Sequence, residues 1–394
     1  MNMYVMGDEE LAAVKRVMDS GNLFRYKDGE KTETDRLEDE IAAKMGVPHA
    51  IAMSSGTAAL ICGLAGMGIG PGHEVLVPAY TFISTALAPL AVGAIPVLTE
   101  IDESLTIDPA DIEKKITPNT KAIIPVDMVG LPCRMDKIMS IAKHHNLFVL
   151  EDACQADGGS YEGKRLGTIG HAGTFSFNHF KILSAGESGA LVTKDRTIYE
   201  RARIHHDGGC VFFSEEARRQ VVPFFAGLNF RISEILSAIV RVQLRRLDTI
   251  LEGLREDKWA IMKAFAGVQG VYPNPINDPK GECGVVAAVL FDTPEMMRTF
   301  LTRCQERGIN ASTPIDSGRH VYTNWEPLLQ RRGAHVESRN PLAGLPTIDK
   351  PEELCPKTLN ILSRTAYISP IPQRDPSERE SFVAKVREAA DGCA

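Results

Sequence analysis

The chain has 394 residues, of which 44% are hydrophobic and 24% charged, and its net charge is −7. These values indicate a globular protein with room for two domains, and the lack of a basic cluster argues against nucleic acid as a partner. The N-terminus shows no signal-peptide pattern, and no apolar run reaches the roughly 20 residues that span a bilayer. The eight cysteines are scattered without a Cys-x-x-Cys pair. We therefore expect a cytoplasmic protein with reduced thiols, no membrane segment and no metal site.

The first half of the chain alternates between helical and strand patterns. Residues 8–20 carry apolar side chains on one helical face, and Gly21 follows them. Strands are predicted at residues 75–78, 95–98, 122–126, 147–150, 174–177 and 190–192, with helices between them that include residues 84–92 and 136–145. Unbroken apolar strands that alternate with helices indicate an α/β fold with a mostly parallel sheet flanked by helices.

The second half begins with a long helix, predicted at about residues 232–254. A strand at residues 285–291, a helix at 294–307 and a final helix at 377–390 follow, with Ser377 as the expected N-cap of the last helix. We interpret residues 1–250 as a large domain and residues 251–394 as a smaller C-terminal α+β domain.

One lysine lies where an apolar strand ends in a glycine-rich turn. The segment Gly-Thr-Phe-Ser-Phe-Asn-His-Phe-Lys-Ile-Leu-Ser-Ala-Gly-Glu-Ser-Gly, residues 173–189, contains Lys181. A lysine amine in such a place can form a Schiff base with the aldehyde of pyridoxal phosphate (PLP). Most loop lysines are solvated surface charges, so the interpretation depends on three further segments.

The first of these segments is a Ser-Gly-Thr sequence at the start of a small-residue helix. Ser55, Gly56 and Thr57 stand where free backbone N–H groups and the helix dipole favour a phosphate. An ordinary helix cap is the alternative, and it is the more common role for this sequence alone. Ser176, five residues before Lys181, is a further candidate for a phosphate contact.

The second segment, Glu-Asp-Ala-Cys-Gln-Ala-Asp, follows the strand at residues 147–150. Carboxylates at this end of a parallel strand lie over the crevice where ligands bind. Because PLP needs an acidic group opposite its pyridine nitrogen, Asp152 is the candidate, and Gln155 is placed to reach the phenolic oxygen. We expect Glu151 to be structural and Asp157 to be a turn residue. The third segment, residues 77–84, leads from a strand end into a helix. Its Phe82 is positioned to stack on the cofactor, with core packing as the alternative.

Five segments together resemble the DegT/StrS sugar aminotransferase family of fold-type I PLP enzymes. In chain order they are Ser55–Ala59, Pro78–Phe82, Glu151–Ala156, Ser176–Gly189 and Gly227–Arg231, and the resemblance extends over roughly residues 8–250. It implies a ping-pong aminotransferase that moves an amino group from an amino acid, usually L-glutamate, to a keto- or aldehydo-sugar or cyclitol.

The resemblance also implies roles for individual residues. Lys181 matches the lysine that carries PLP and moves the proton, Asp152 the partner of the pyridinium nitrogen, Gln155 the group beside the phenolic oxygen and Phe82 the stacking ring. The phosphate cup is matched by Gly56, Thr57 and Ser176. Asn229 matches an asparagine that reaches the phosphate from the neighbouring subunit, so the family implies a homodimer with shared active sites.

Two positions depart from the family pattern. Ser188 stands where the family's Gly-Glu-Gly-Gly has glycine, and we expect it to alter the backbone or contact the substrate. His179 precedes Lys181 by two residues, whereas family members with histidine in place of the lysine are dehydratases. A PLP-dependent sugar dehydratase and a non-catalytic PLP-fold regulatory protein are therefore the alternatives, and retention of Lys181 favours the aminotransferase.

The substrate is the least defined part of the prediction. Segments such as Gly21–Tyr26 and Leu166–Gly170 are similar to the branch that makes 8-amino-3,8-dideoxy-octulosonate. His205–Asp207 is a further candidate segment for the mouth of the site. The candidate substrate contacts are Arg25, Glu187, Arg231, Arg319, His320 and Tyr322. For each of them, a local ion pair or hydrogen bond is the alternative role.

Overall fold

The computed structural model describes residues 3–27, 29–208, 220–333, 336 and 340–393, and the structural statements below concern these residues. Cys210 lies outside them, and the other seven cysteines are buried and form no disulfide. Within the described part, no helix combines the length and apolar character needed to cross a membrane.

A seven-stranded sheet forms the centre of the molecule, and its strand order is β1-β9-β8-β5-β4-β2-β3. Only β9 runs antiparallel to its neighbours, β1 and β8, so the predicted mostly parallel sheet is confirmed. In chain order the strands are β1 (His49–Met53), β2 (Glu74–Pro78), β3 (Ile95–Thr99), β4 (Thr120–Ile123), β5 (Phe148–Asp152), β8 (Ala172–Ser176) and β9 (Gly189–Thr193).

The sequence patterns locate these strands closely, with two differences. Strand β1 was not predicted, although four of its five residues are buried. Strand β4 ends at Ile123 instead of continuing to Val126. Pro125 has no backbone N–H to donate to a sheet ladder, and Val126 retains only an isolated bridge to Asp152.

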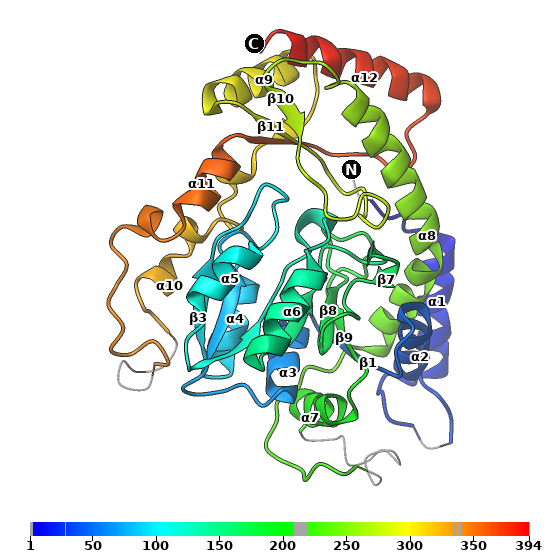
Figure 1. Ribbon diagram of the computed structural model, residues 1–394. Helices are drawn as coiled ribbons and strands as arrows, with labels where there is room; N and C mark the ends of the chain where they lie inside the picture. The colour runs from blue at the N-terminus through cyan, green and yellow to red at the C-terminus, as the bar shows by residue number, and fades with distance from the viewer. Residues whose placement is uncertain (1–2, 28, 209–219, 334–335, 337–339, 394) are drawn as a thin grey trace.

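Helices cover both faces of this sheet (Figure 1). A hydrophobic core lies on each face of the sheet. Side chains of β2 alternate between them, since Leu76 belongs to one core while Val75 and Val77 belong to the other. The first core is covered by α2 (Glu33–Met45), α5 (Pro109–Lys115), α6 (Met135–His145) and the first part of α8 (Glu234–Lys263). The second is covered by α3 (Gly56–Gly66), α4 (Ser84–Ala91) and α7 (Arg196–His206).

The C-terminal part contains a smaller antiparallel sheet in the order β10-β11-β13-β12. Its strands are β10 (Val271–Pro273), β11 (Ala287–Phe291), β12 (Ala311–Ser312) and β13 (Thr365–Ile368), and α9 (Pro294–Glu306) and α12 (Pro376–Asp391) pack with them. In Figure 1 this layer lies above the large sheet. The N-cap of α12 is Asp375, not Ser377, because the Asp375 carboxylate accepts a hydrogen bond from the Ser377 backbone N–H at 2.9 Å.

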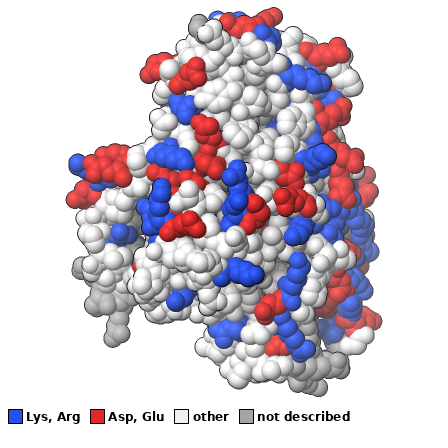
Figure 2. Space-filling model, in the orientation of Figure 1, with Lys and Arg blue, Asp and Glu red and all other residues white. Residues whose placement is uncertain are grey.

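Helix α8 connects the two layers without interruption. It packs against α1 (Asp8–Ser20) and α2 at its N-terminal end, and its C-terminal end contributes Ile261 and Met262 to the core of the smaller sheet. The boundary predicted near residue 250 lies inside this helix, and the division into domains stays a prediction. Acidic and basic side chains are interspersed over the face drawn in Figure 2, most densely over α1 and α8.

The remaining short elements complete the chain. A hairpin of β6 (Ser160–Tyr161) and β7 (Lys164–Arg165) follows β5. Helices α10 (Glu326–Leu329) and α11 (Pro356–Ser363) return to the large sheet, where Leu328 and Leu362 join the second core. This return brings the segment around residue 320 next to the end of β2, because the Thr81 N–H donates to the His320 carbonyl at 2.9 Å.

Candidate active site

A cavity of about 230 Å³ lies where the C-terminal ends of β2, β5 and β8 meet the N-terminus of α3. This is the edge of the sheet at which parallel α/β folds bind ligands. Residues from four separate segments of the chain converge there. The lining includes these residues named from the sequence: Ser55, Gly56, Thr57, Phe82, Asp152, Gln155, Ser176, Lys181 and Glu187.

The N-terminus of α3 forms one wall of the cavity. Ser55 is its N-cap, and its hydroxyl oxygen accepts a hydrogen bond from the Ala58 N–H at 3.0 Å. The Thr57 hydroxyl donates to Ser84 Oγ at 2.9 Å, which gathers several hydroxyl groups at this helix end. Free N–H groups of the first turn and the helix dipole make the wall suited to an anion.

Glycines allow this wall to form. A side chain at Gly56 would place its Cβ 2.9 Å from both Cys154 Sγ and Ser176 Cβ. A Cβ at Gly189 would lie 2.5 Å from the Gly56 backbone nitrogen. The strand that follows the Lys181 loop therefore approaches the start of α3 closely because both positions lack a side chain.

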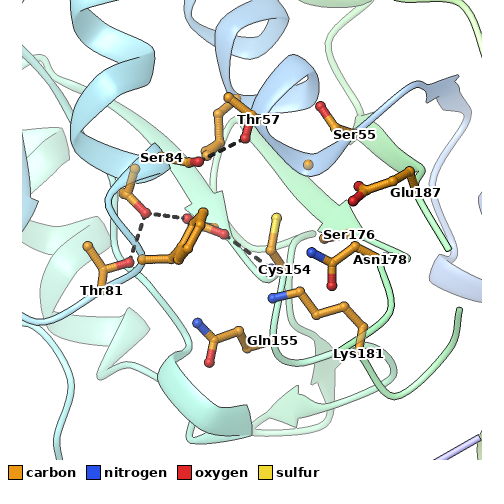
Figure 3. Close-up of a pocket in the computed structure, with 15 residues that line it drawn as sticks. Ser55, Thr57, Thr81, Ser84, Cys154, Gln155, Ser176, Asn178, Lys181 and Glu187 are labelled. Atoms are coloured by element: carbon orange, nitrogen blue, oxygen red, sulfur yellow. Dashed lines mark hydrogen bonds between the residues drawn. The ribbon is translucent and has the colours of Figure 1, made fainter. Parts of the chain in front are cut away.

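The Asp152 carboxylate is held by two donors. The Thr85 hydroxyl donates to Oδ2 at 2.8 Å, and the Cys154 N–H donates to Oδ1 at 3.2 Å. The single hydroxyl proton of Thr85 is used in this bond, so its 2.8 Å contact with Thr81 has Thr81 as the donor. The dashed lines in Figure 3 follow this chain of hydroxyls, which fixes a buried carboxylate at the cavity wall.

Lys181 is half-buried, and its amine extends into the cavity between the side chains of Gln155 and Asn178 (Figure 3). The Gln155 amide is oriented by the Val129 N–H, which donates to its Oε1 at 3.1 Å. Burial raises the pKa of the Cys154 thiol well above its usual value, against the opposing effect of the Lys181 charge. The site thus combines a lysine amine, a fixed carboxylate and a neutral thiol.

Phe82 stands at the opening, with 38% of its surface exposed. Its ring is tilted against that of His320, with 5.6 Å between the centroids. His320 Nδ1 contacts the Ser317 hydroxyl at 2.6 Å, and burial together with the charges of Lys181 and Arg319 lowers the pKa of His320 to about 4. The imidazole is therefore neutral near pH 7 beside the lysine.

Other predicted substrate contacts lie elsewhere. Arg25 is buried and forms two hydrogen bonds of 2.8 Å with the carboxylate of Glu38, so its guanidinium serves an internal ion pair. Tyr322 is fully buried, and its hydroxyl accepts a hydrogen bond from the Cys355 N–H at 3.2 Å. Both side chains belong to the protein interior, where a substrate does not reach them, and this corrects the expectation for them.

The segment around Asn229 also lies outside the cavity lining. Asn229 Oδ1 accepts a hydrogen bond from the Arg231 N–H at 3.3 Å, and Arg231 forms an ion pair with Asp207. His206 is fully buried against Arg25, at 3.1 Å from its guanidinium. Among the described residues, no cluster of three His, Cys, Asp or Glu side chains could hold a metal ion.

Two neighbours of the site, Glu151 and Ser188, differ in how well they were anticipated. Glu151 is fully buried and accepts hydrogen bonds from the N–H groups of Gly167, Ile169 and Gly170, which confirms a structural role; burial raises its pKa to about 7 despite these donors. Ser188 is buried beneath the cavity wall and contributes no lining.

His179 does not line the cavity. Its Nδ1 lies 2.9 Å from the Tyr4 hydroxyl, so the N-terminal segment contacts the lysine loop from the other side. Asp157 lies in a turn, as expected, and is buried, with 1% of its surface exposed.

Sequence reasoning missed several lining residues. Thr81 and Thr85 are separated by four residues at the start of a helix, a spacing that places two side chains together and was a usable signal. The others carried no signal in the sequence, because ordinary Leu, Ser, Cys and Asn residues gain a role only from the fold. The missed residues are Leu60, Thr81, Ser84, Thr85, Cys154 and Asn178.

An anion-binding helix end, a lysine amine and a fixed carboxylate, gathered at the C-terminal edge of a mostly parallel sheet, define an α/β enzyme of the aminotransferase class. Residues 5–326 match the model of the DegT/DnrJ/EryC1/StrS aminotransferase family. The chain belongs to this family.

Known relatives cover most of the chain. The dTDP-3-amino-3,4,6-trideoxy-alpha-D-glucose transaminase of Streptomyces venezuelae is 41% identical over 85% of this chain and 82% of its own length. The 3-amino-5-hydroxybenzoate synthase of Amycolatopsis mediterranei (strain S699) is 36% identical over 81% and 82%. The crystal structure of S. venezuelae DesV in complex with a ketimine intermediate superposes with a TM-score of 0.76, at 31% identity, over 97% of this chain and 94% of that one.

Proposed function

We propose that the protein uses PLP to move an amino group from an amino-acid donor, L-glutamate, to a keto- or aldehydo-sugar or cyclitol. The observation that carries the proposal is that Lys181, Asp152 and the N-terminus of α3 line one cavity. A transaminase of a dTDP-linked amino sugar and a synthase of an aminobenzoate among the relatives support this range of acceptors.

The donor set fits PLP. The first-turn N–H groups of α3 and the hydroxyls of Ser55 and Ser176 can donate hydrogen bonds to a phosphate, and the helix dipole favours its charge. The Thr57 hydroxyl, which donates to Ser84 in this structure, would turn to the phosphate on binding. Because Gly56 has no side chain, Cys154 and Ser176 can pack directly against the start of the helix, which brings the Ser176 hydroxyl to these donors. When bound, PLP supplies the electron sink for breaking the Cα–H bond of the donor.

The other side chains have matching tasks. The Asp152 carboxylate, fixed by Thr85, would face the pyridine nitrogen and keep it protonated. Gln155 would hydrogen-bond the phenolic oxygen, and Phe82 would cover one face of the ring. The Lys181 amine would take the proton from the donor carbon and return it at the next carbon, as a general base and then a general acid.

We further propose a homodimer in which Asn229 of the second copy completes the phosphate site. In the single chain Asn229 is absent from the cavity lining. Beside it, Phe24 is 45% and Leu228 53% exposed, and the Phe24 ring lies 5.7 Å from the guanidinium carbon of Arg231. These exposed apolar side chains beside Asn229 favour contact between this surface and another protein chain.

The half-reaction with the donor tests the function. Addition of L-glutamate to the protein loaded with PLP is expected to convert the visible absorption to that of the aminated cofactor and to release one 2-oxoglutarate per site. Lys181→Ala should lose this release by about a thousandfold or more. The matched control is Lys164→Ala, since Lys164 is an exposed lysine on β7, outside the lining. Full turnover by Lys181→Ala, or no release with any amino-acid donor, would overturn the proposal.

The acceptor requires a second experiment. Protein aminated by glutamate is mixed with a free keto-sugar acid, a nucleotide-linked keto-sugar or a keto-cyclitol, and recovery of the original absorption identifies the acceptor. The octulosonate branch suggested by the sequence stays a prediction. It requires that the free keto-sugar acid restore the original absorption.

A further inference from the structure

Val129 adopts a backbone conformation that valine rarely takes. Its φ of 49° and ψ of 32° lie in the left-handed region, and among the described residues it is the only β-branched one with a positive φ. This region is costly for valine, because the branched side chain crowds the adjacent backbone carbonyl. Strain of this kind persists only where the surrounding structure holds it, and it gathers at functional positions.

The left-handed conformation directs the Val129 N–H at Gln155, whose Oε1 accepts a hydrogen bond from it at 3.1 Å. The oxygen and the nitrogen are opposite ends of one planar amide, so holding the oxygen also places the nitrogen. Gln155 Nε2 carries two N–H groups, of which one donates to Met128 Sδ at 3.3 Å and the other has no partner within the described part of the chain. Figure 3 shows the nitrogen of this amide turned toward the other lining side chains and the oxygen turned away from them.

The same amide rotated by half a turn would have the opposite chemistry. It would present its oxygen to the cavity, where the proposed cofactor also presents an oxygen. Two acceptors that face each other repel and share no hydrogen bond, whereas an N–H group opposite that oxygen donates to it. The Val129 N–H therefore decides whether Gln155 meets a ligand as a donor or as an acceptor.

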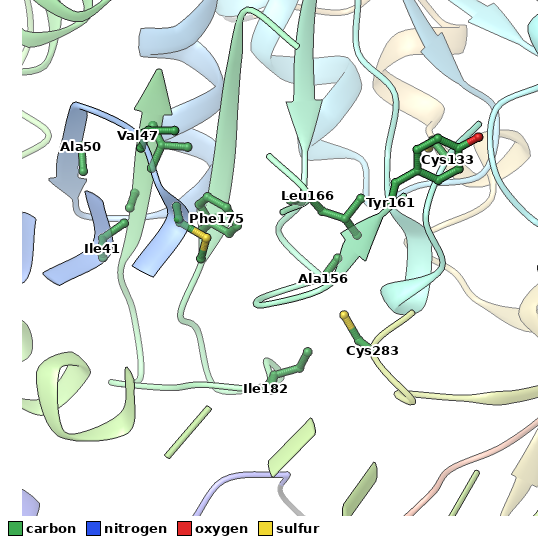
Figure 4. Packing of buried hydrophobic residues seen from close by; sticks show 14 of the residues in the cluster. Ile41, Val47, Ala50, Cys133, Ala156, Tyr161, Leu166, Phe175, Ile182 and Cys283 are labelled. Carbon is green, nitrogen blue, oxygen red and sulfur yellow. The ribbon is translucent and has the colours of Figure 1, made fainter. Parts of the chain in front are cut away.

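Hydrogen bonds to separate segments hold the turn around Val129. The Asp127 N–H donates to the Asp152 carbonyl at 3.1 Å, and the Asp127 carboxylate accepts the Cys133 N–H at 2.9 Å. On the other side, the Gly130 carbonyl accepts the Cys283 N–H at 3.0 Å, and a Cβ at Gly130 would lie 2.7 Å from the Cys283 Cβ. Cys133 and Cys283 belong to one buried cluster, drawn in part in Figure 4. The turn is thus fixed both from the large sheet and from the segment before β11.

We propose that Val129 is a positioning residue whose left-handed N–H makes Gln155 a hydrogen-bond donor to the phenolic oxygen of PLP. The proposal rests on the function proposed above, in which Gln155 reaches that oxygen. A donor stabilises the oxygen in its anionic form, so it favours the deprotonated form of the bound cofactor. The strained turn therefore lowers the pH at which the bound cofactor loses its proton.

The first test removes the N–H and nothing else. Val129 is replaced by its α-hydroxy acid analogue, which converts the backbone amide to an ester and keeps the valine side chain. The full chain is loaded with PLP, and its visible absorption is followed against pH. The midpoint of the absorption change should rise by about one pH unit, because a hydrogen bond to the anionic form of the cofactor is lost. An unchanged or lower midpoint would overturn the proposal.

Two further variants separate the N–H from a general change of structure. Val129→Gly keeps the N–H and suits the left-handed conformation, so its midpoint should stay within about 0.3 pH unit of the unchanged protein. A shift in the glycine variant as large as that of the ester would overturn the proposal. In a Gln155→Leu background the ester should add no shift, because the N–H then has no amide to orient. A full shift in that background would show that the N–H acts through another group, which also contradicts the proposal.

The orientation of Gln155 is also measured without PLP. Heteronuclear NMR spectra are recorded on the full chain with isotope-labelled glutamine side chains, and Gln155→Leu identifies the Gln155 amide signal. This signal should shift or split in the ester protein, where both amide orientations become accessible, and should stay in place in Val129→Gly. An unmoved signal in the ester protein would contradict the proposal. If the unchanged protein shows no PLP absorption that Lys181→Ala abolishes, the proposed function fails, while the NMR spectra still decide the role of Val129.

Discussion

The Asp152 carboxylate owes its orientation to neighbouring hydroxyl groups. Thr81 donates to Thr85, and Thr85 donates to Asp152 at 2.8 Å. The second carboxylate oxygen faces the Cys154 N–H, so the side chain is constrained from two sides. Neither threonine is charged, yet removal of one hydroxyl group would change the orientation of the buried carboxylate toward a bound ligand.

Thr85→Val tests this dependence. Valine keeps the shape but loses the donor, and a hydrogen bond to a charged group contributes about 1.5–3 kcal/mol, so kcat/KM should fall roughly tenfold to a hundredfold. Thr85→Ser keeps the hydroxyl and should remain within about threefold of the unchanged protein. Steady-state kinetics with glutamate measures both variants, and equal activity of the valine and serine proteins would contradict the argument.

Individual side chains show where sequence reasoning succeeds and fails. The positions of Asp152 and Gln155 followed from their place after an apolar parallel strand, because this end of the strand always faces the crevice. Tyr322 was misplaced for a different reason. Whether a loop residue points to solvent or into the core depends on contacts with distant segments, here with the Cys355 N–H, and the local sequence does not reveal such contacts.

At the level of elements, the cap of α12 makes a prediction about pH. The Asp375 carboxylate accepts hydrogen bonds from the backbone N–H and hydroxyl of Ser377, and these bonds hold the pKa of Asp375 below its usual value. A carboxyl with a lowered folded-state pKa stabilises the protein above its unfolded pKa, and this contribution is lost as the pH falls through the folded value.

Asp375→Ala should therefore lower the thermal midpoint at pH 7 by about 1–2 °C, and the midpoints of the two proteins should converge as the pH falls below about 4. Asp375→Asn is the matched control, because asparagine caps a helix as well as aspartate but does not titrate. Thermal denaturation followed by circular dichroism provides the midpoints. A difference that stays constant into acid would rule out the carboxylate as the cap.

Element boundaries were the less predictable part of the fold. Apolar runs located β2, β5, β8 and β9, since these strands are buried on both faces of the sheet. They also located β3, although it is an edge strand and mostly half-buried. Helix α8 continues to Lys263, nine residues beyond its predicted end at residue 254, because its last turns pack into the core of the smaller sheet. Tertiary packing of this kind outweighs local patterns at helix ends.

At the scale of the whole molecule, α8 ties the two sheets together through a buried ion pair. The Lys258 amine and the Glu282 carboxylate are both fully buried, 2.8 Å apart, and burial lowers the pKa of the lysine. The same carboxylate accepts the Gly284 N–H at 2.7 Å. Such a pair specifies one arrangement of the segment before β11, since loss of either partner leaves a buried charge uncompensated. That segment also carries Cys283, a neighbour of Asp157.

The proposed dimer makes a prediction that no single chain can satisfy. Lys181→Ala removes the lysine from the cavity of one subunit. Asn229→Ala, in the other subunit, removes the asparagine that serves either its own cavity or that of its partner. Each variant alone should be nearly inactive at limiting PLP. The two proteins are co-expressed with different tags and purified through both tags, so that only heterodimers are measured.

If the sites are shared, the heterodimer contains one site with both changes and one with neither, and it should retain about half of the unchanged activity per dimer. If Asn229 serves its own subunit, every site in the heterodimer lacks one of the two groups, and no activity returns. Lys164→Ala paired with the unchanged chain controls for the tags. Because Asn229 stands outside its own cavity lining, beside the exposed Phe24 and Leu228, we expect recovery.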